Sequence, residues 1–407
     1  MASTLIGLAG IVVILGFAVL LSSDRRAINL RVVGAAFGLQ VLIAVVVIYS
    51  SAGQSVIESM SEVVLTVMGY SREGIEFIFG GLATEESVAS FAINVLPIIV
   101  FFSSLMAVMY YIGIMQLFVR IVGGGLRLLI GTRAVESMNA AANIFIGQTE
   151  APLVVKPYLP RLSDPQMFAV MSSGLASVAG TVLLAYASFG AELKYLLAAS
   201  FMAAPGGLLM AKIIMPDSLS EAPEDSSSLQ IPKSEHENIF LAAAVGASDG
   251  VKLAVNIGAM LIAFVALIAL FNGLVGWLAG LVGIDGLTLQ KMLGWLFSPV
   301  MFLLGIPWAD AQAAGALFGE KLILNEFVAF THLTEYLAGM SERTVAIVTF
   351  SLCGFANLSS IAILLGGLGS LVPEKKPIIA RFGLRAVAAG SLSNLMSAAL
   401  AGLLLSF

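Results

Sequence analysis

The chain has 407 residues, of which 59% are hydrophobic and 11% are charged, and its formal net charge is −5 at pH 7. A soluble core cannot take up so much apolar sequence, and repeated apolar runs of about 18 residues or more are typical of a helical protein that crosses the membrane several times. The sequence has no basic tract and no P-loop or zinc-ligand spacing, so we expect no nucleic-acid partner. Cys353 is the single cysteine, which excludes an intrachain disulfide and a cysteine metal cluster.

The first third of the chain predicts three membrane spans and one helix along the membrane surface. Apolar runs place the spans at about residues 5–21, 32–49 and 91–118. From Val56 to Met68, apolar side chains recur at helical spacing with polar residues between them, which is the pattern of an amphipathic interfacial helix. Arginines follow the first span, so the positive-inside rule predicts that this loop faces inside and the N-terminus outside.

A re-entrant hairpin is predicted over residues 134–158. Cations flank this segment on both sides, so it is expected to enter and leave the membrane on the inner side. Gly147 and Pro152 interrupt helical structure in its middle, where the polar side chains of 148–150 stand in apolar sequence. Lipid cannot satisfy the freed backbone groups, so the tip should lie inside protein or line a water-filled cavity. A polar clasp between helices is the alternative interpretation.

Three further spans are expected at about residues 167–189, 195–215 and 251–282. The middle of the first of them, 172–181, consists of small and polar residues and should therefore face the hairpin rather than lipid. The segment 216–238, rich in proline, serine and acidic residues, is the linker-like stretch of the sequence and is predicted to be an inner loop.

The last third of the chain repeats this pattern in altered form. An interfacial apolar piece at 292–308 precedes a second polar interruption, Asn325 and Glu326, and we expect a second re-entrant hairpin that enters from outside. A salt bridge with Lys321 is the alternative role for the Glu326 carboxylate. The seventh and eighth spans are expected at about 345–371 and 386–405, which places the C-terminus outside.

A short sequence recurs after each hairpin. Residues 174–177 read Gly-Leu-Ala-Ser, and residues 354–357 read Gly-Phe-Ala-Asn. Chance recurrence in helices rich in glycine and alanine is the alternative, but the matching hairpins favour inverted repeats, whose substrate sites lie at the membrane midplane where broken helices meet. We therefore expect an all-α polytopic membrane protein with eight transmembrane helices, two opposed re-entrant hairpins and interfacial helices.

Three motifs resemble the signature segments of the concentrative nucleoside transporters. They are Gly147-Gln-Thr-Glu-Ala-Pro152, Gly319-x-Lys-x-x-x-Asn-Glu-Phe-Val-Ala-Phe330 and Cys353-Gly-Phe-Ala-Asn-x-Ser-Ser360. The resemblance covers essentially the whole chain, in the eight-span form typical of bacterial members. It implies a homotrimer in which each protomer carries its own pathway and a mobile transport domain moves against a trimeric scaffold.

The expected division of the chain follows from this resemblance. Residues 1–133 form scaffold spans and interfacial helices, and 134–190 form the first hairpin and the fourth span of the transport domain. Residues 191–285 contain the fifth and sixth spans, 286–372 form the second hairpin and seventh span of the transport domain, and 373–407 form the eighth span.

A nucleoside offers ribose hydroxyls and amide-like base edges, which call for hydrogen-bond acceptors, an amide or hydroxyl group and an apolar contact. The sequence supplies such groups at the motifs. By resemblance, the substrate residues are Gln148 and Thr149 for the base with Glu150 beside them, Glu326, Asn357 and Ser360 for the ribose, and Phe355 and Val182 for apolar contact.

Sodium prefers oxygen ligands, and unwound helices offer backbone carbonyls for it. Asn143 and Ser177 provide side-chain oxygens, and Ile146 and Val178 provide carbonyls. The resemblance implies that these four residues form a sodium site, with sodium transported alongside the substrate. No organic cofactor is expected.

The sequence therefore predicts a symporter, not an enzyme, that imports nucleosides such as uridine with sodium by alternating access across a bacterial inner membrane. A proton-coupled nucleoside symporter is the alternative, in which Glu150 or Glu326 would titrate. An intramembrane enzyme would need a metal cluster or an activated nucleophile, and the sequence offers no convincing one. A channel suits two hairpins that each carry a carboxylate less well than an occluding site does.

Overall fold

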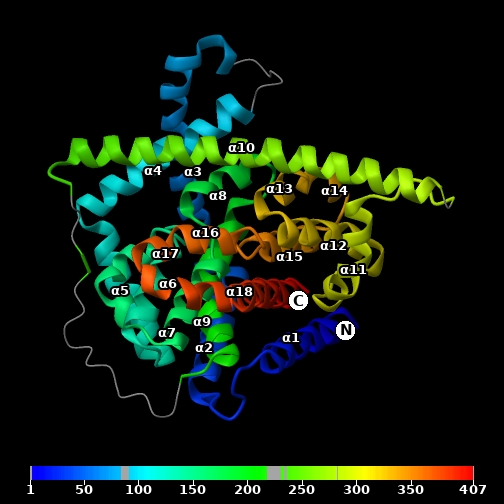
Figure 1. The fold of residues 1–407 in the computed structure, drawn as a ribbon, viewed down its shortest axis with the longest axis horizontal. Coiled ribbons are helices and arrows are strands. Elements are labelled where there is room, and N and C mark those ends of the chain that lie inside the picture. The colour runs from blue at the N-terminus through cyan, green and yellow to red at the C-terminus, as the bar shows by residue number, and fades with distance from the viewer. Residues whose placement is uncertain (1, 84–90, 218–230, 233–235, 282, 407) are drawn as a thin grey trace.

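Helices make up the fold, and α10 (Ile239–Gly280) crosses the full width of the view as a single helix of 42 residues (Figure 1). The computed structural model describes residues 2–83, 91–217, 231–232, 236–281 and 283–406. The π-helical turn η3 (Phe91–Val95) leads into α4 (Leu96–Tyr111), which packs along α10. A Cβ on Gly250 would stand 2.7 Å from the Cα of Val100, so glycine permits this close packing.

Six helical stretches of the described residues are long and apolar enough to cross a membrane. They are Leu30–Tyr49, Phe91–Tyr111, Asp164–Ser188, Leu193–Ile214, Ile239–Gly280 and Pro373–Leu404. They stand where the second to sixth spans and the eighth span were expected. The first expected span is the shorter apolar helix α1 (Ala2–Leu20), and the seventh is divided into shorter helices. The all-helical fold is thus confirmed, whereas the count of eight crossings stays a prediction.

The C-terminal end predicted for the third span, residues 91–118, is wrong. Its helix stops at Tyr111, and Gly113 adopts a φ of +90°, a left-handed conformation that glycine allows. A separate helix follows, α5 (Ile114–Ile130), whose buried residues recur at helical spacing on one face. Apolar composition alone did not distinguish this amphipathic helix from a continuation of the span.

The sixth span, expected at residues 251–282, begins earlier in the structure than predicted. α10 already starts at Ile239, where the side chain of Asn238 accepts a hydrogen bond from the Leu241 N–H at 2.9 Å and caps the helix. Its first turns, 239–245, are apolar, but the small and polar residues 246–250 follow them and interrupt the hydropathy pattern ahead of the expected span. Most of the predicted loop 216–238, which precedes α10, lies outside the described residues.

The expected amphipathic helix is present and longer than predicted, while its interfacial location stays a prediction. α3 (Ser51–Phe79) follows α2 (Leu30–Ala44) and the π-helical turn η1 (Val45–Tyr49), and a 3₁₀ turn, η2 (Gly80–Ala83), ends it. Its buried residues lie on one face, while its other side chains are partly or fully exposed.

The first hairpin reverses the chain at the polar stretch that the sequence marked. α6 (Ala134–Ala142) leads into a non-helical segment, 143–150, and the chain returns through the 3₁₀ helix η4 (Ala151–Arg161). Three prolines in the returning arm lack a backbone N–H, which prevents a regular α-helix there.

The second hairpin has the same plan. α12 (Trp308–Ile323) ends just before Asn325, and α13 (Glu326–Thr331) and α14 (Leu333–Tyr336) form the returning arm. The interfacial piece expected before this hairpin is α11 (Leu289–Leu303), which packs on α12 and is bent by 117° from it. α5 packs on α6 in the same way, so each hairpin has an amphipathic helix against its first arm.

Two spans are broken in the middle, and their breaks meet. The fourth span consists of α7 (Asp164–Ala176) and α8 (Gly180–Ser188), and the seventh of α15 (Glu342–Leu352) and α16 (Ser360–Gly366), followed by α17 (Leu368–Leu371). The N–H of Phe355 donates to the carbonyl of Ser177 at 3.0 Å, which joins one break to the other.

Each hairpin also bonds to the broken span of its own half. The Gly180 N–H donates to the Phe145 carbonyl at 2.8 Å, and the Leu358 N–H donates to the Leu322 carbonyl at 3.1 Å. The two halves thus satisfy the backbone groups of their breaks in corresponding ways, as expected for inverted repeats.

A side chain of the last helix, α18 (Lys376–Leu404), closes both breaks. The amide nitrogen of Asn394 donates to the carbonyl of Ala176 at 2.7 Å and to the carbonyl of Cys353 at 2.8 Å. Its amide oxygen accepts from the Lys321 ammonium at 2.8 Å, and this ammonium also donates to the carbonyl of Ser351 at 3.2 Å. We call these five residues the Asn394 junction.

The Asn394 junction shows that Lys321 does not form the salt bridge with Glu326 that was considered as an alternative. In the described part of the chain, Glu326 forms no ion pair with this lysine, and the fully buried ammonium is instead bonded to Asn394 and Ser351. The remaining long helices pack around the hairpins and broken spans, with α9 (Leu193–Ile214) against α7 and α18, α2 against α9, and α1 against α18. The 3₁₀ turn η5 (Pro373–Lys375) precedes α18.

Replacing Asn394 with leucine should destabilise the protein strongly. The substitution leaves two buried carbonyls and a buried ammonium without this partner, a loss of about 3 kcal/mol in the free energy of unfolding. Thermal unfolding of the detergent-purified protein measures it. Ser393→Ala is the matched control, because Ser393 is buried on the same helix and its hydroxyl has no hydrogen-bond partner in the described structure. Equal melting temperatures for the two variants would contradict the role of the junction.

Candidate functional site

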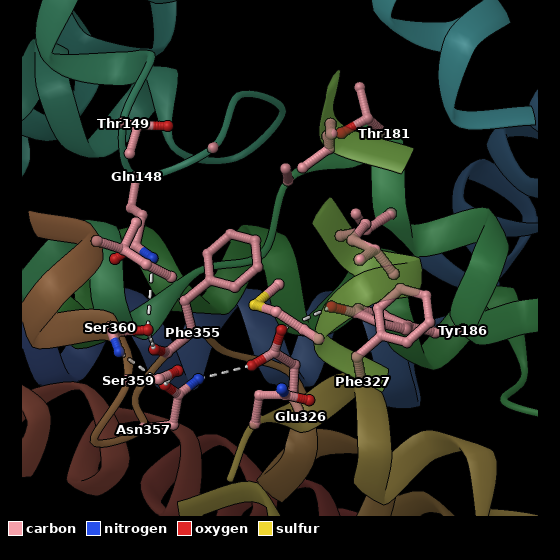
Figure 2. A pocket seen from close by; sticks show the side chains of 18 of the residues that line it. Gln148, Thr149, Thr181, Tyr186, Glu326, Phe327, Phe355, Asn357, Ser359 and Ser360 are labelled. Carbon is pink, nitrogen blue, oxygen red and sulfur yellow. Dashed lines mark hydrogen bonds between the residues drawn. The ribbon is translucent and has the colours of Figure 1, made fainter. Parts of the chain in front are cut away.

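A pocket lies where the two hairpin tips and the two helix breaks come together (Figure 2). Segments from both halves of the chain line it, including 147–150, α8, the tip of the second hairpin and the break 353–359. α10 closes one side with apolar side chains only, namely Leu253, Ile257, Met260 and Leu261. The polar groups of the pocket therefore come from the hairpins and broken spans, while the long helix supplies an apolar wall.

Glu326 is the buried carboxylate of this pocket, with 5% of its surface exposed. It is the first residue of α13, whose N-terminus is capped by Asn325 through a 2.9 Å bond from the Val328 N–H. Tyr186 donates to one carboxylate oxygen at 3.0 Å and the Asn357 amide donates to the other at 3.0 Å, as Figure 2 shows. Two fixed donors thus orient a carboxylate that can still accept further hydrogen bonds.

The break in the seventh span presents Asn357 and Ser360. The Asn357 amide oxygen accepts from the Ser360 N–H at 2.8 Å and from the Ser359 hydroxyl at 2.7 Å, which leaves its NH₂ group directed at Glu326. The Ser360 hydroxyl donates to the carbonyl of Phe355. The unwound backbone is therefore held by its own side chains, and these same side chains line the pocket.

The tip of the first hairpin supplies the other polar groups. The Gln148 amide nitrogen lies 3.5 Å from the Ser360 hydroxyl, the outer limit of a hydrogen bond, and its amide oxygen has no partner in the described structure although the residue is 95% buried. Thr149 is half-buried, and Glu150 is exposed toward the pocket. A buried amide with an unused acceptor is suited to a polar ligand edge.

All eight residues that the sequence assigned to the substrate line this single pocket. They are Gln148, Thr149, Glu150, Val182, Glu326, Phe355, Asn357 and Ser360. Sequence reasoning missed Thr181, Tyr186, Phe327 and Ser359, and the four side chains of α10. Tyr186 follows Val182 by one helical turn and so shares its face, a signal that could have identified it. Nothing in the uniformly apolar sequence of α10 marks the residues that form the wall.

The four residues assigned to sodium lie in the tip of the first hairpin and in the break of the fourth span, two segments that the Gly180–Phe145 backbone bond joins. The Asn143 amide nitrogen donates to the Asn139 carbonyl at 2.9 Å, while its amide oxygen is buried and has no partner among the described residues. A Cβ on Gly174 would lie 3.7 Å from that oxygen, and the Ser177 hydroxyl bonds to the Gly174 carbonyl at 3.1 Å. Asn143 and Ser177 therefore lie against the same glycine.

The sequence also assigned two backbone carbonyls to sodium. Ile146 and Val178 stand in the non-helical segments of the hairpin and of the broken span, and no backbone N–H of the described residues donates to their carbonyls. Amide, hydroxyl and carbonyl oxygens suit a hard monovalent cation, and the orphaned Asn143 oxygen is the atom that such an ion would satisfy. In the described part of the chain, no cluster of histidine, cysteine and acidic residues offers a different metal site.

Two re-entrant hairpins and two broken spans around a polar pocket at membrane depth define a membrane transporter rather than an enzyme. Family models agree along the chain. "Na+ dependent nucleoside transporter N-terminus" matches residues 9–82, "Nucleoside recognition" matches 92–193, and "Na+ dependent nucleoside transporter C-terminus" matches 195–402. The chain belongs to the Na+-dependent, concentrative nucleoside transporter family.

Relatives over the full length support this assignment. The nucleoside permease NupC of Helicobacter pylori is 49% identical, with 98% of each chain covered. The sodium/nucleoside cotransporter 2 of Rattus norvegicus is 36% identical over 98% of this chain, which spans 62% of the rat protein. These relatives are transporters and permeases, and with the apolar helices they make this chain a multi-pass membrane protein.

Solved structures of a related transporter, CNTnw, show the same fold. Its inward-facing, substrate-bound state superposes with a TM-score of 0.94 at 49% identity, covering 99% of this chain and 98% of that one. A doubly substituted form in an outward-facing state superposes with a TM-score of 0.94 at 48% identity, covering 100% and 98%. The relative therefore adopts inward- and outward-facing states, which is what alternating access requires.

Proposed function

We propose that this protein is a sodium-coupled symporter that imports nucleosides such as uridine by alternating access. The observation that carries the proposal is the arrangement of Glu326, Asn357 and Ser360 at one side of the pocket with Gln148 facing Ser360 from the other hairpin. The carboxylate and the hydroxyl suit the vicinal hydroxyls of ribose, and the amide suits the edge of a base.

The carboxylate of Glu326 recognises the ribose. The Glu326 carboxylate keeps acceptor capacity beyond its bonds to Tyr186 and Asn357, and two sugar hydroxyls can donate to it. The base lies toward Gln148 and Thr149, with Glu150 near its polar edge, and Phe355 and Val182 pack on its faces. A molecule without hydroxyls would leave the buried carboxylate unpaired, which disfavours its binding.

Sodium is the co-substrate, and it binds between the first hairpin and the break of the fourth span. The side chains of Asn143 and Ser177 and the carbonyls of Ile146 and Val178 would hold it. One ion moving down ~100 mV gains about 2.3 kcal/mol, and a tenfold concentration gradient adds about 1.4 kcal/mol. Together these support an accumulation of several hundred-fold, so one ion for each nucleoside is sufficient.

The packing of the helices suggests which of them form the mobile transport domain and which form the static scaffold. The Asn394 junction ties the broken spans and the second hairpin into one body, and α10, α4 and α3 lie beside that body as the scaffold (Figure 1). α1 and α2 pack on α18 and α9, so we assign these two spans to the moving side, although the sequence placed them with the scaffold. The pocket slides along the apolar wall of α10 as the transport domain moves.

The arrangement in the membrane completes the proposal. The scaffold joins three copies into a homotrimer in which each protomer transports independently. Both termini face outside, since the cationic loops face the cytoplasm. The membrane is a bacterial inner membrane, as the bacterial relatives suggest.

Proton coupling is the second candidate mechanism. Glu150 is a carboxylate in the pocket that forms no ion pair in the described part of the chain. A proton carried on Glu150 or Glu326 could replace the sodium ion as the driving ion.

Sodium should stabilise the protein through Asn143. In wild type, sodium chloride should raise the melting temperature above that in choline chloride, because a bound ion stabilises the folded state. Asn143→Ala should remove this difference. Asn139→Ala is the matched control: its amide bonds to Ser173 and lies one turn away, so it should lower stability in both salts but keep the sodium response. A full sodium response in Asn143→Ala would place the ion elsewhere.

Glu326→Gln should weaken uridine binding by roughly 10- to 100-fold, because a charge-assisted hydrogen bond is lost and a group that donates is added. Isothermal titration of the purified protein in sodium buffer measures the dissociation constant. Glu320→Gln is the control, since Glu320 is a buried carboxylate of the same hairpin that bonds to Gln290 and His332 and does not line the pocket. Wild-type affinity in Glu326→Gln would refute the assigned ribose site.

A further inference from the structure

Tyr186 is a fully buried phenol whose hydroxyl reaches the carboxylate of the pocket. It lies on α8 and donates to Glu326 on α13 at 3.0 Å, across 140 residues of sequence. A buried phenol hydroxyl without a partner is costly, whereas phenylalanine would fill the same space without needing one. The hydroxyl at this position therefore calls for an explanation beyond packing.

The ring of Tyr186 is held on two sides. It stacks on Phe330 with a centroid distance of 4.3 Å and an interplanar angle of 16°, and it meets Phe327 edge to face at 5.5 Å and 68°. Both partners belong to α13, the short helix that begins with Glu326. The hydroxyl is thus fixed relative to the carboxylate by the same helix that carries the carboxylate.

We propose that Tyr186 is a positioning residue that sets the orientation of the Glu326 carboxylate and thereby makes the pocket selective for sugars with free vicinal hydroxyls. The inference rests on the proposed function, because it assigns Glu326 to a sugar. A carboxylate has two acceptor positions on each oxygen. Tyr186 takes one on the first oxygen and Asn357 takes one on the second. The carboxylate keeps acceptor capacity beyond these two bonds, and two adjacent sugar hydroxyls can donate to it.

Removal of the phenol hydroxyl would release this arrangement. Without the Tyr186 bond, the carboxylate is held less firmly about its terminal bond, and its freed acceptor position is taken by water. A sugar with two hydroxyls then has to order the carboxylate when it binds. A nucleoside without these hydroxyls does not use the carboxylate and is indifferent to its orientation.

The test compares two ligands in four proteins. Dissociation constants for uridine and for 2′,3′-dideoxyuridine are measured by isothermal titration in sodium buffer for wild type, Tyr186→Phe, Glu326→Gln and the double variant. Tyr186→Phe should weaken uridine about 10-fold and change dideoxyuridine by less than about 3-fold. In the Glu326→Gln background, Tyr186→Phe should have little further effect, because its action passes through the carboxylate.

Two controls make the result interpretable. The ratio of the two affinities in one preparation does not depend on how much of the protein is folded, so partial unfolding cannot imitate the effect. Tyr195→Phe removes another phenol hydroxyl, which bonds to Glu342 at 2.8 Å outside the pocket lining, and it should leave the ratio unchanged.

The possible contrary results distinguish failure of the positioning role from failure of the proposed function. Equal weakening of both ligands in Tyr186→Phe, or an undiminished effect in the Glu326→Gln background, would overturn the positioning role and leave the proposed function intact. Failure of wild type to bind either nucleoside would overturn the proposed function and this inference together.

Discussion

Breaking a helix at membrane depth frees backbone groups that lipid cannot satisfy, and the rest of this structure depends on how two such breaks are closed. One amide on α18, that of Asn394, bonds to the carbonyl end of both broken helices, and its oxygen is held by the Lys321 ammonium. The Lys321 ammonium lies at the C-terminal end of α15, so its positive charge also interacts favourably with the negative end of that helix dipole. A Cβ on Gly354 would stand within 2.2 Å of the Asn394 side chain, so glycine is required for the amide to reach the break.

The site follows from this closure. Because the breaks are fixed, the residues within them can turn polar side chains inward: Asn357 and Ser360 meet Glu326 on one side, and the orphaned Asn143 oxygen stands beside Ser177 on the other. The proposed sugar and ion sites are thus two products of the same interrupted helices. α10 supplies no polar group to the pocket, so in the proposed mechanism the transport domain would meet this scaffold helix through apolar contacts, which permit sliding.

The pocket residues were assigned through the family resemblance of three motifs. Local sequence by itself indicated the hairpin tips, because a carboxylate such as Glu326 in an apolar run is costly and is retained for a reason. It could not indicate Asn394, which lies in an ordinary apolar helix and whose partner Ala176 is 218 residues away. Tyr186 was within reach through its spacing from Val182, but an aromatic residue in a span is equally typical of a core. The predicted end of the third span was wrong because α5 is apolar on one face and continues the apolar run. Only Gly113 marks the boundary between the two helices.

The most direct test of the account is radiolabelled uridine uptake into proteoliposomes that hold the purified protein, with an inward sodium gradient compared with an inward proton gradient at equal sodium. Sodium coupling predicts accumulation above the external concentration with the sodium gradient alone, and simple equilibration when sodium is equal on both sides. Accumulation driven by the proton gradient in the absence of a sodium gradient would contradict the proposed coupling, and no uridine uptake under either gradient would contradict the substrate.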